Sequence, residues 1–308
     1  EVRQVDSNVD YCCKQISDML KDKTFTNSQY NVFTKNDKGK ERVIYKLPYY
    51  PDRVVHHAIL QVLEPIWKKT FIRSTYQSIK GRGVHRAKVD VEQAIKQLGN
   101  NARYAQMDIK KFYPSVDNEI MKQIVAKKIK CKDTLWLLYT IIDSMDGLPI
   151  GNYISQYLGN LYLTYFDHEM KEKYQCRHYF RYCDDIVIIS NDKDKVSKMV
   201  EVANTKLGGL KVKLKTQIKQ DKVSNGLDFL GFVFYGNKTL LRKSIASNFK
   251  RTADEFVRNA SKDLLNSVIS YNGWIIVSDS YNLWKNKINT KLRQAAIQVN
   301  LNHKLIWR

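Results

Sequence analysis

The segment 182–185, with the sequence YCDD, places two neighbouring carboxylates, Asp184 and Asp185, between apolar runs. A charge that is buried without a partner is strongly unfavourable, so buried carboxylates are paired, neutralised or bound to a cation. Aromatic residues precede the segment and the β-branched run 186–189 follows it, which predicts a strand, a tight turn and a second strand. Both acids would then lie at the tip of a hairpin, where a divalent metal could meet them. The alternative is an ordinary polar turn, because Asp is common in turns.

A third carboxylate, Asp108, ends an expected short strand at 104–109. If that strand pairs beside the hairpin, Asp108, Asp184 and Asp185 converge and could hold two Mg²⁺ ions roughly 3.5–4 Å apart. One ion would activate a 3′-hydroxyl, and the other would hold a triphosphate and stabilise the leaving pyrophosphate. Asp117 competes with Asp108 for this role, but its position before Asn118 is typical of a helix N-cap.

Hydrophobic periodicity and turn residues predict the elements that must position these acids. We expect a hairpin over 30–47, the strand at 104–109, the hairpin at Asp184, and further strands over 211–218 and 227–235. We expect helices over 11–20, 52–71, 84–98, 118–129, 133–142, 154–173 and 196–207, and a mainly helical region after 243. Strands and helices mix without regular βαβ alternation, which indicates an α+β fold.

Composition favours a nucleic-acid partner. The 308 residues include 52 Lys and Arg against 31 Asp and Glu, a formal net charge of +21. Such an excess attracts polyanions through steering and counterion release, although a solvated basic surface is the simpler alternative. No apolar run approaches the length of a membrane span, so we expect no membrane association. The five cysteines show no zinc-site spacing, and we expect reduced thiols in a cytoplasmic protein.

Six segments resemble the successive blocks of a reverse transcriptase, in order. They are RVIYKLPYYPDRVVHHAIL, SIKGRGVHRA, DIKKFYPSVD, LPIGNYISQ, YCDD and FLGF. The resemblance implies a right-hand polymerase with fingers at 1–102, a palm at 103–236 and a helical thumb at 237–308, with 119–146 contributing to the fingers. It implies an RNA-directed DNA polymerase that uses Mg²⁺ (Mn²⁺ can serve in vitro), deoxynucleoside triphosphates, a template RNA and a primer or cDNA strand.

The block at 148–156 resembles most closely the reverse transcriptases of diversity-generating retroelements. Most reverse transcriptases have Gln and Pro where this chain has Ile150 and Gln156. Members of the diversity-generating group misincorporate opposite template adenines, which mutates a variable gene. An isoleucine cannot hydrogen-bond the incoming nucleotide as an amide could, so the pocket would lose a polar constraint. Ile150 could instead be only a packing residue.

The same resemblance implies a template-repeat RNA, a small basic accessory protein and a bacterial, archaeal or phage source. Two alternatives remain. One is another prokaryotic reverse transcriptase of retron, group II intron or phage-defence type. The other is a non-catalytic nucleic-acid-binding scaffold.

Further residues take roles from the resemblance, one by one. Tyr113 would block a ribose 2′-hydroxyl, while Phe112 fits the core better. The Ile109 carbonyl would help to bind metal. Lys40 and Arg42 would grip the triphosphate, for which guanidinium and ammonium groups are suited.

The remaining assignments concern the nucleotide and the two strands. Gly151 joins Ile150 and Gln156 in the nucleotide site. Lys215 would protonate pyrophosphate, with Lys211 or Lys213 as substitutes. Arg82 would approach the template, and Gly231 would allow the backbone to approach the primer or else mark a bulge.

Overall fold

The computed structural model describes residues 2–37, 39–288 and 290–298, and it divides the chain into two compact units. Unit 1 comprises residues up to 83 together with 106–188 and 197–219. Unit 2 comprises 84–105, 189–196 and the chain from 220 onward. This division follows packing, so the predicted fingers, palm and thumb boundaries stay predictions.

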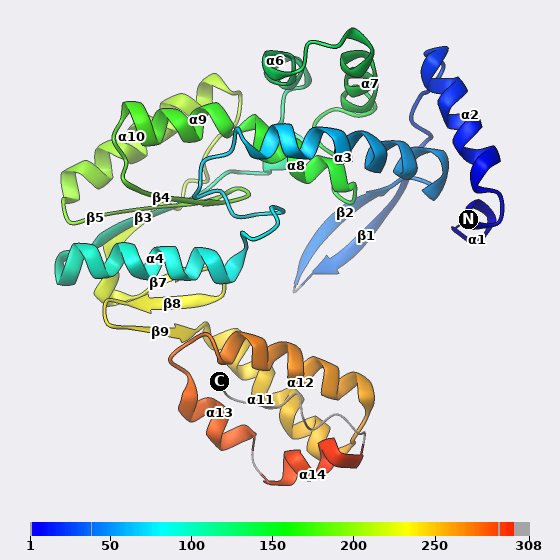
Figure 1. The fold of residues 1–308 in the computed structure, drawn as a ribbon. Coiled ribbons are helices and arrows are strands. Elements are labelled where there is room, and N and C mark those ends of the chain that lie inside the picture. Colours follow the sequence, from blue (N-terminus) through cyan, green and yellow to red (C-terminus); the bar gives the residue numbers. More distant parts are fainter. Residues whose placement is uncertain (1, 38, 289, 299–308) are drawn as a thin grey trace. The chain divides into compact units, whose positions relative to one another are not determined.

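Unit 1 begins with two helices and a hairpin. The elements are α1 (Val2–Asp6), α2 (Val9–Lys21), β1 (Asn31–Asp37), β2 (Lys40–Lys46), the π-helical turn η1 (Tyr49–Arg53) and α3 (Val54–Lys68). The two strands pair antiparallel with Thr34 opposite Val43 and Lys35 opposite Arg42. The hairpin expected at 30–47 is therefore confirmed (Figure 1).

Helices make up most of the middle of unit 1. They are α5 (Phe112–Ser115), α6 (Asn118–Lys128), α7 (Lys132–Ile142), α8 (Tyr153–Tyr162), α9 (Thr164–His168) and η3 (Glu169–Lys173). Asp117 Oδ1 accepts a hydrogen bond from Ile120 N at 2.9 Å, which satisfies one of the donors left open at the start of α6. Asp117 is therefore an N-cap, as the sequence predicted.

A four-stranded sheet carries the predicted acids. Its order is β4-β5-β3-β6, with β4 at His178–Tyr182, β5 at Asp185–Ser190, β3 at Arg103–Asp108 and β6 at Lys219–Lys222. All four residues from Ile186 to Ile189 are buried, as expected of a strand covered on both faces. Figure 1 shows α9 and α10 (Lys193–Gly209) above this sheet.

Unit 2 combines a helix, a small sheet and a helical end. Its elements are α4 (Val84–Leu98), η2 (Gly99–Asn101), η4 (Val223–Asn225), β7 (Leu227–Phe229), β8 (Phe232–Tyr235), β9 (Lys238–Leu241), α11 (Lys243–Arg258), α12 (Lys262–Ile275), α13 (Tyr281–Lys287) and α14 (Thr290–Gln298). Its core is aromatic, with Phe229, Phe232, Phe234, Phe249 and Phe256 all buried. The mainly helical region expected after 243 is confirmed over 243–288 and 290–298, and the rest of it lies outside the described residues.

Two strand predictions need correction. Over 211–218 only Leu214 forms a bridge, to Ile109, because Lys211 adopts a left-handed φ of 56° in the turn that ends α10. The predicted strand at 227–235 is instead a hairpin of β7 and β8. Its turn consists of Leu230 and Gly231, whose φ values of 52° and 85° suit the two-residue turns that join antiparallel strands.

The structure also bears on membrane association and thiol chemistry. Among the described residues, no helix is both long and apolar enough to cross a bilayer. All five cysteines are free thiols.

Candidate active site

The segment Tyr182–Asp185, here named the carboxylate turn, joins β4 to β5. Cys183 and Asp184 form the turn itself, and Asp185 opens β5. Cys183 has a φ of 57°, a left-handed conformation that non-glycine residues adopt at a cost. The turn therefore holds its two acids in a conformation that the surrounding structure must maintain.

Asp108 lies at the end of its strand, beside the carboxylate turn. Its strand, β3, is the hydrogen-bonded neighbour of β5. One residue after Asp108, the Ile109 N–H donates to the Asp184 carbonyl oxygen at 3.2 Å. The predicted pairing of this strand beside the hairpin is confirmed, and it brings the backbone of Asp108 and Ile109 against the carboxylate turn.

A lysine already pairs with Asp108. Lys215 N donates to the Asp108 carbonyl at 2.8 Å, and Lys110 N donates to the Lys213 carbonyl at 2.8 Å, so 213–215 runs beside the end of β3. Lys215 Nζ lies 2.7 Å from Asp108 Oδ1, although this buried oxygen has no partner with hydrogen-bond alignment. The contact is thus an ion pair. Lys211 instead pairs with Asp117, at 2.5 Å, so of these two lysines it is Lys215 that meets Asp108.

Burial makes ionisation of Asp184 unfavourable. Desolvation raises the pKa of its carboxyl group, and the negative charge of Asp108 adds to the rise, while Lys215 lowers it. A cation placed between the two carboxylates would relieve both effects. The electrostatics of this site therefore favour binding of positive charge.

Tyr113 stands beside the carboxylate turn. The Cys183 thiol donates to the Tyr113 hydroxyl at a distance of 3.8 Å, and burial raises the pKa of that phenol. The Tyr113 carbonyl accepts from Leu148 N at 2.8 Å, and a Cβ on Gly147 would come within 2.8 Å of the same carbonyl oxygen. Phe112 is buried, as the sequence predicted for a core residue.

The block at 148–156 is attached to the hairpin β1–β2. Tyr45 N donates to the Ile150 carbonyl at 2.8 Å, while the Ile150 side chain is half-buried. Gly151 has a φ of 122°, and a Cβ there would lie 3.0 Å from the Tyr45 carbonyl oxygen, so only glycine fits. Gln156 Oε1 accepts a short hydrogen bond from the Ser78 hydroxyl.

Lys40 and Arg42, the residues predicted to bind the triphosphate, lie on the same β1–β2 hairpin. Arg42 is an exposed residue of β2. The side chain of Lys40 lies outside the described part of the structure, so its predicted role stays a prediction.

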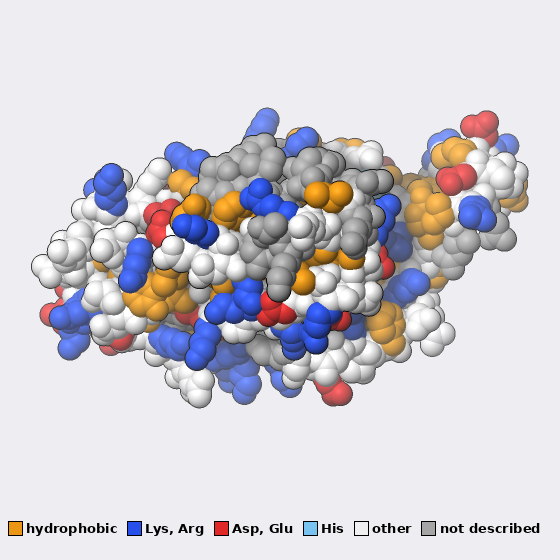
Figure 2. Space-filling model, turned by 90° about the horizontal axis from the view of Figure 1, so that it is seen from below, with side chains coloured by type: hydrophobic (Ala, Val, Ile, Leu, Met, Phe, Trp, Pro, Cys, Tyr) orange, Lys and Arg blue, Asp and Glu red, His pale blue; other side chains and the backbone are white. Residues whose placement is uncertain are grey.

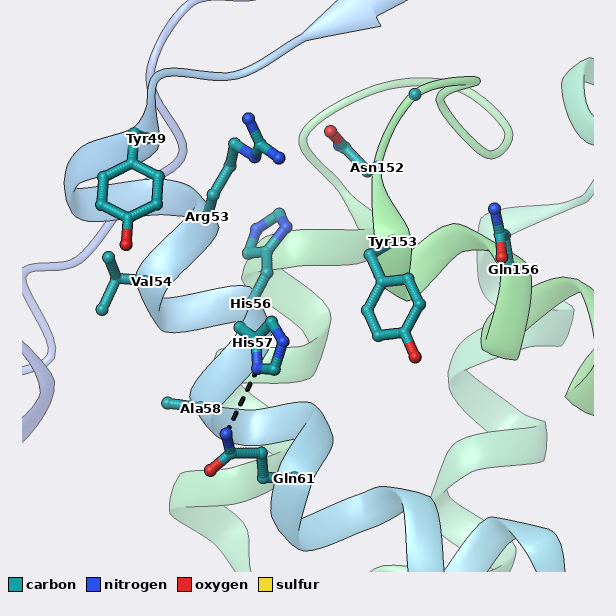
Figure 3. A pocket seen from close by; sticks show the side chains of 11 residues that line it. Tyr49, Arg53, Val54, His56, His57, Ala58, Gln61, Asn152, Tyr153 and Gln156 are labelled. Carbon is teal, nitrogen blue, oxygen red and sulfur yellow. Dashed lines mark hydrogen bonds between the residues drawn. The ribbon is translucent and has the colours of Figure 1, made fainter. Parts of the chain in front are cut away.

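A cavity of about 600 Å³ opens beside this block (Figure 3). Figure 3 shows Arg53 and His57, from η1 and α3, to one side of this cavity and Asn152, Tyr153 and Gln156 to the other. The rings of His57 and Tyr153 stack at a centroid distance of 5.8 Å. Guanidinium, amide and stacked ring groups in one cavity suit a phosphate or an unpaired base.

A sequence model of the family described as reverse transcriptase (RNA-dependent DNA polymerase) matches residues 33–234. The chain belongs to the reverse transcriptase family. The matched region runs from β1 to β8 and contains Asp108 and the carboxylate turn. The predicted enzyme class, RNA-directed DNA polymerase, is thereby confirmed at the level of the family.

Individual relatives are more distant. Protein YkfC of Escherichia coli (strain K12) is 25% identical over 258 residues, which cover 69% of this chain and 67% of YkfC. The structure resembles apo telomerase from Candida tropicalis, with a TM-score of 0.57, 14% identity and 91% of this chain covered. It also resembles telomerase from Candida albicans in complex with the TWJ fragment of telomeric RNA, with a TM-score of 0.56, 10% identity and 89% of this chain covered.

These likenesses concern the fold. The chain spans 58% and 55% of the two telomerase chains. The predicted fold class, an α+β right-hand polymerase, is confirmed.

Reverse transcriptase domains generally use divalent metal ions, and the groups at the carboxylate turn fit such an ion. Asp108 Oδ1 is buried and meets Lys215 Nζ without hydrogen-bond alignment, and burial raises the pKa of Asp184. Carboxylate and carbonyl oxygens are the ligands that Mg²⁺ prefers. Over the described ranges, no three His, Cys, Asp or Glu side chains stand close enough to hold a metal as they are. At Asp108 the Lys215 ammonium already supplies the positive charge.

Two residues predicted to contact nucleic acid, Arg82 and Gly231, make contacts within the protein itself in this reverse transcriptase. Arg82 Nη1 donates to the Ile72 carbonyl at 2.7 Å, which fixes the loop that precedes α4. Gly231 has a φ of 85°, which favours glycine, and a Cβ there would lie 2.7 Å from Ile245 Cδ1, which would have to move. Roles of either residue toward template or primer stay predictions.

Sequence reasoning missed Arg181. This arginine of β4 is fully buried and forms an ion pair with Asp167, which is also fully buried. Burial alone would lower the pKa of Arg181, but the charge and hydrogen bonds of Asp167 raise it overall. The signal in the sequence is a single charge inside the apolar strand HYFRY, since a buried charge requires a partner.

Proposed function

We propose that this chain copies RNA into DNA at the carboxylate turn, with Asp108, Asp184 and Asp185 and the Ile109 carbonyl as ligands of two Mg²⁺ ions. The observation that carries the proposal is the pairing of β3 beside β5, with Ile109 N bound to the Asp184 carbonyl. Bound Mg²⁺ would lower the pKa of the primer 3′-hydroxyl and neutralise charge on the triphosphate. Mn²⁺ can replace it in vitro.

The chain's own residues would orient the nucleotide. The ring of Tyr113 would exclude a ribose 2′-hydroxyl, and its contacts with Leu148 N and the Cys183 thiol support this role because they fix it beside the carboxylate turn. Lys215 is exposed and within reach of Asp108, so its ammonium can turn to a triphosphate and donate a proton to the departing pyrophosphate. Arg42 and Lys40 on β2 would hold the outer phosphates.

The basic surface would hold the template RNA and the growing strand. In the face drawn in Figure 2, blue basic side chains are widely spread and red acidic ones are fewer, in agreement with the formal charge of +21. Counterion release from phosphates would supply most of this affinity.

The narrower proposal is that the enzyme serves a diversity-generating retroelement. Its support is Ile150 and Gln156, where most reverse transcriptases have Gln and Pro. The Ile150 backbone is tied to Tyr45 and the residue is half-buried, and in the proposed role its side chain would offer the nucleotide a hydrocarbon in place of an amide. A small basic accessory protein and a template-repeat RNA would be its partners, and copied adenines would be mutated in a variable gene.

Primer extension on RNA templates tests both levels. The wild type should extend a DNA primer, and Asp108→Asn should abolish extension without loss of folding. Sequencing of the products should show errors concentrated opposite adenine, and these errors should fall several-fold in Ile150→Gln, which restores the polar constraint. The assay is run with and without the accessory protein.

The outcomes separate the two levels. Extension with uniform errors at all four template bases would contradict the diversity-generating role and favour another prokaryotic lineage. Unchanged synthesis by Asp108→Asn would contradict the metal assignment itself.

A further inference from the structure

Arg181 is a buried cation two residues before Cys183, in a strand otherwise filled with apolar and aromatic side chains. Its side chain binds Asp167, Asn160 and the Cys183 carbonyl oxygen. A guanidinium in such surroundings is stable only if each of its five N–H groups finds an acceptor.

Every donor of Arg181 is accounted for. Nε donates to Asp167 Oδ1 at 2.8 Å, and Nη2 donates to Asp167 Oδ2 at 2.5 Å. Nη2 also donates to the Asn160 carbonyl at 3.3 Å, and Nη1 to Asn160 Oδ1 at 3.2 Å. The remaining Nη1 donor goes to the Cys183 carbonyl at 3.1 Å. One N–H of the guanidinium thus binds the carboxylate turn, and the other four bind Asp167 and Asn160, which keep the guanidinium in place.

The position of the Cys183 carbonyl oxygen affects the orientation of the Asp184 side chain. Cys183 has a left-handed φ, so its conformation must be imposed from outside the turn. Its carbonyl and the Asp184 N–H belong to one planar peptide group, so fixing the oxygen fixes the plane from which the Asp184 side chain starts. Asp184 is the acid whose burial opposes ionisation, and a small rotation would change its distance to a cation.

The residues that bind Arg181 come from separate elements of the fold. Asn160 lies on α8, which begins inside the 148–156 block, and Asp167 lies on α9. The Arg181 backbone is also paired: its N–H donates to the Ser74 carbonyl at 2.9 Å, and its carbonyl accepts from Tyr76 N at 3.1 Å. Asn160 and Asp167 therefore fix the guanidinium, and Ser74 and Tyr76 fix the Arg181 backbone, independently of the contact with the carboxylate turn.

We propose that Arg181 is a positioning residue that orients Asp184 for metal binding through the Cys183 carbonyl, without touching substrate or metal. The inference rests on the proposed metal role of Asp184. Lysine cannot replace it, because an ammonium has three donors on one atom and cannot span Asp167, Asn160 and Cys183 together.

The test is Arg181→Lys, studied by Mn²⁺ titration with electron paramagnetic resonance, by melting temperature and by affinity for an RNA–DNA duplex. The folded variant should bind Mn²⁺ roughly 10- to 100-fold more weakly, the usual effect of removing a group that orients a metal ligand. Duplex affinity should stay at the wild-type level. Raising the Mg²⁺ concentration should restore part of the extension rate, because the defect lies in metal affinity.

Tyr179→Phe is the matched control. Its hydroxyl donates to Asp167 Oδ1 at 2.6 Å, so the variant loses a bond of the same buried network but leaves the Arg181 contact to Cys183 in place. It should lose stability and keep wild-type Mn²⁺ affinity. Should Arg181→Lys fail to fold, the double variant Asp167→Asn/Arg181→Gln serves instead, since replacing both partners of a buried ion pair is far less costly than removing one.

Wild-type Mn²⁺ affinity in either folded Arg181 variant would overturn the inference. So would an equal loss of Mn²⁺ affinity in Tyr179→Phe, which would indicate general packing. Failure of the proposed function looks different: the wild type itself would bind no Mn²⁺, or Asp184→Asn would bind it as well as the wild type does.

Discussion

Asp184 is a carboxylate that the fold keeps in a place unfavourable for its own charge. Burial and the neighbouring Asp108 both raise its pKa. For an acid whose pKa is higher in the folded than in the unfolded state, stability falls as pH rises from the unfolded to the folded pKa. Above that window the full penalty remains, unless a cation compensates for it.

Asp184→Asn should therefore separate activity from stability. RNA-templated synthesis should fall roughly a hundredfold or more, the order expected when a main electrostatic group is removed. The melting temperature of the metal-free protein at neutral pH should rise, because the buried charge is gone. This gain should shrink as pH falls and vanish below about pH 4, where the Asp184 carboxyl is neutral in both the folded and the unfolded protein.

Calorimetry of the metal-free protein across this pH range measures the effect. Asp18→Asn, at an exposed carboxylate of α2, is the control and should change neither quantity. A lower melting temperature in Asp184→Asn at neutral pH would contradict the assigned pKa shift.

At the scale of elements, α3 shows how one helix serves two environments. His56 faces inward, is buried and contacts Asn27 Oδ1 at 3.2 Å, while the adjacent His57 is exposed and stacks on Tyr153. Burial lowers the pKa of His56 to about 4, and the nearby Asp52 only partly offsets this. His56 is therefore neutral in the folded protein at neutral pH.

This buried histidine should make the wild type acid-sensitive. The unfolded chain takes up a proton near pH 6.5 but the folded protein does not until about pH 4, so stability is lost as pH falls through that window. The loss should be about 3 kcal/mol at most. His56→Gln should remove this part of the pH dependence in urea unfolding, whereas His57→Gln should retain it. An unchanged acid limb in His56→Gln would contradict the assignment.

Some elements follow from local sequence alone and others do not. Helix α4 spans the predicted 84–98, because its apolar periodicity and the following glycine are local signals. The segment 211–218 alternates like a strand, yet it serves to close α10 and to place Lys215 against Asp108. That outcome depends on a neighbour about 100 positions away, which no local pattern contains.

At the scale of the whole molecule, the charge of +21 should govern nucleic-acid binding. Contacts to six to ten phosphates would weaken affinity by about 10³- to 10⁵-fold between 50 and 200 mM salt. Fluorescence anisotropy of a labelled RNA–DNA duplex across a NaCl series measures the slope. Asp184→Asn should keep the same slope, since it changes the metal site and leaves the basic surface intact. A flat salt dependence would exclude phosphate contacts as the main source of affinity.

The sequence by itself determined the family, and it predicts the three acids of the site, because both reside in short motifs whose residue types are set by chemistry. Which partners the side chains of the site and its surroundings contact was decided by the tertiary structure alone. Lys215 rather than Lys211 reaches Asp108. Arg82 binds the Ile72 carbonyl, Gly231 adopts the left-handed φ of its turn, and Arg181 is anchored from α8 and α9. The physical reason is that burial and hydrogen bonding are fixed by neighbours in space, while a sequence motif records only neighbours along the chain.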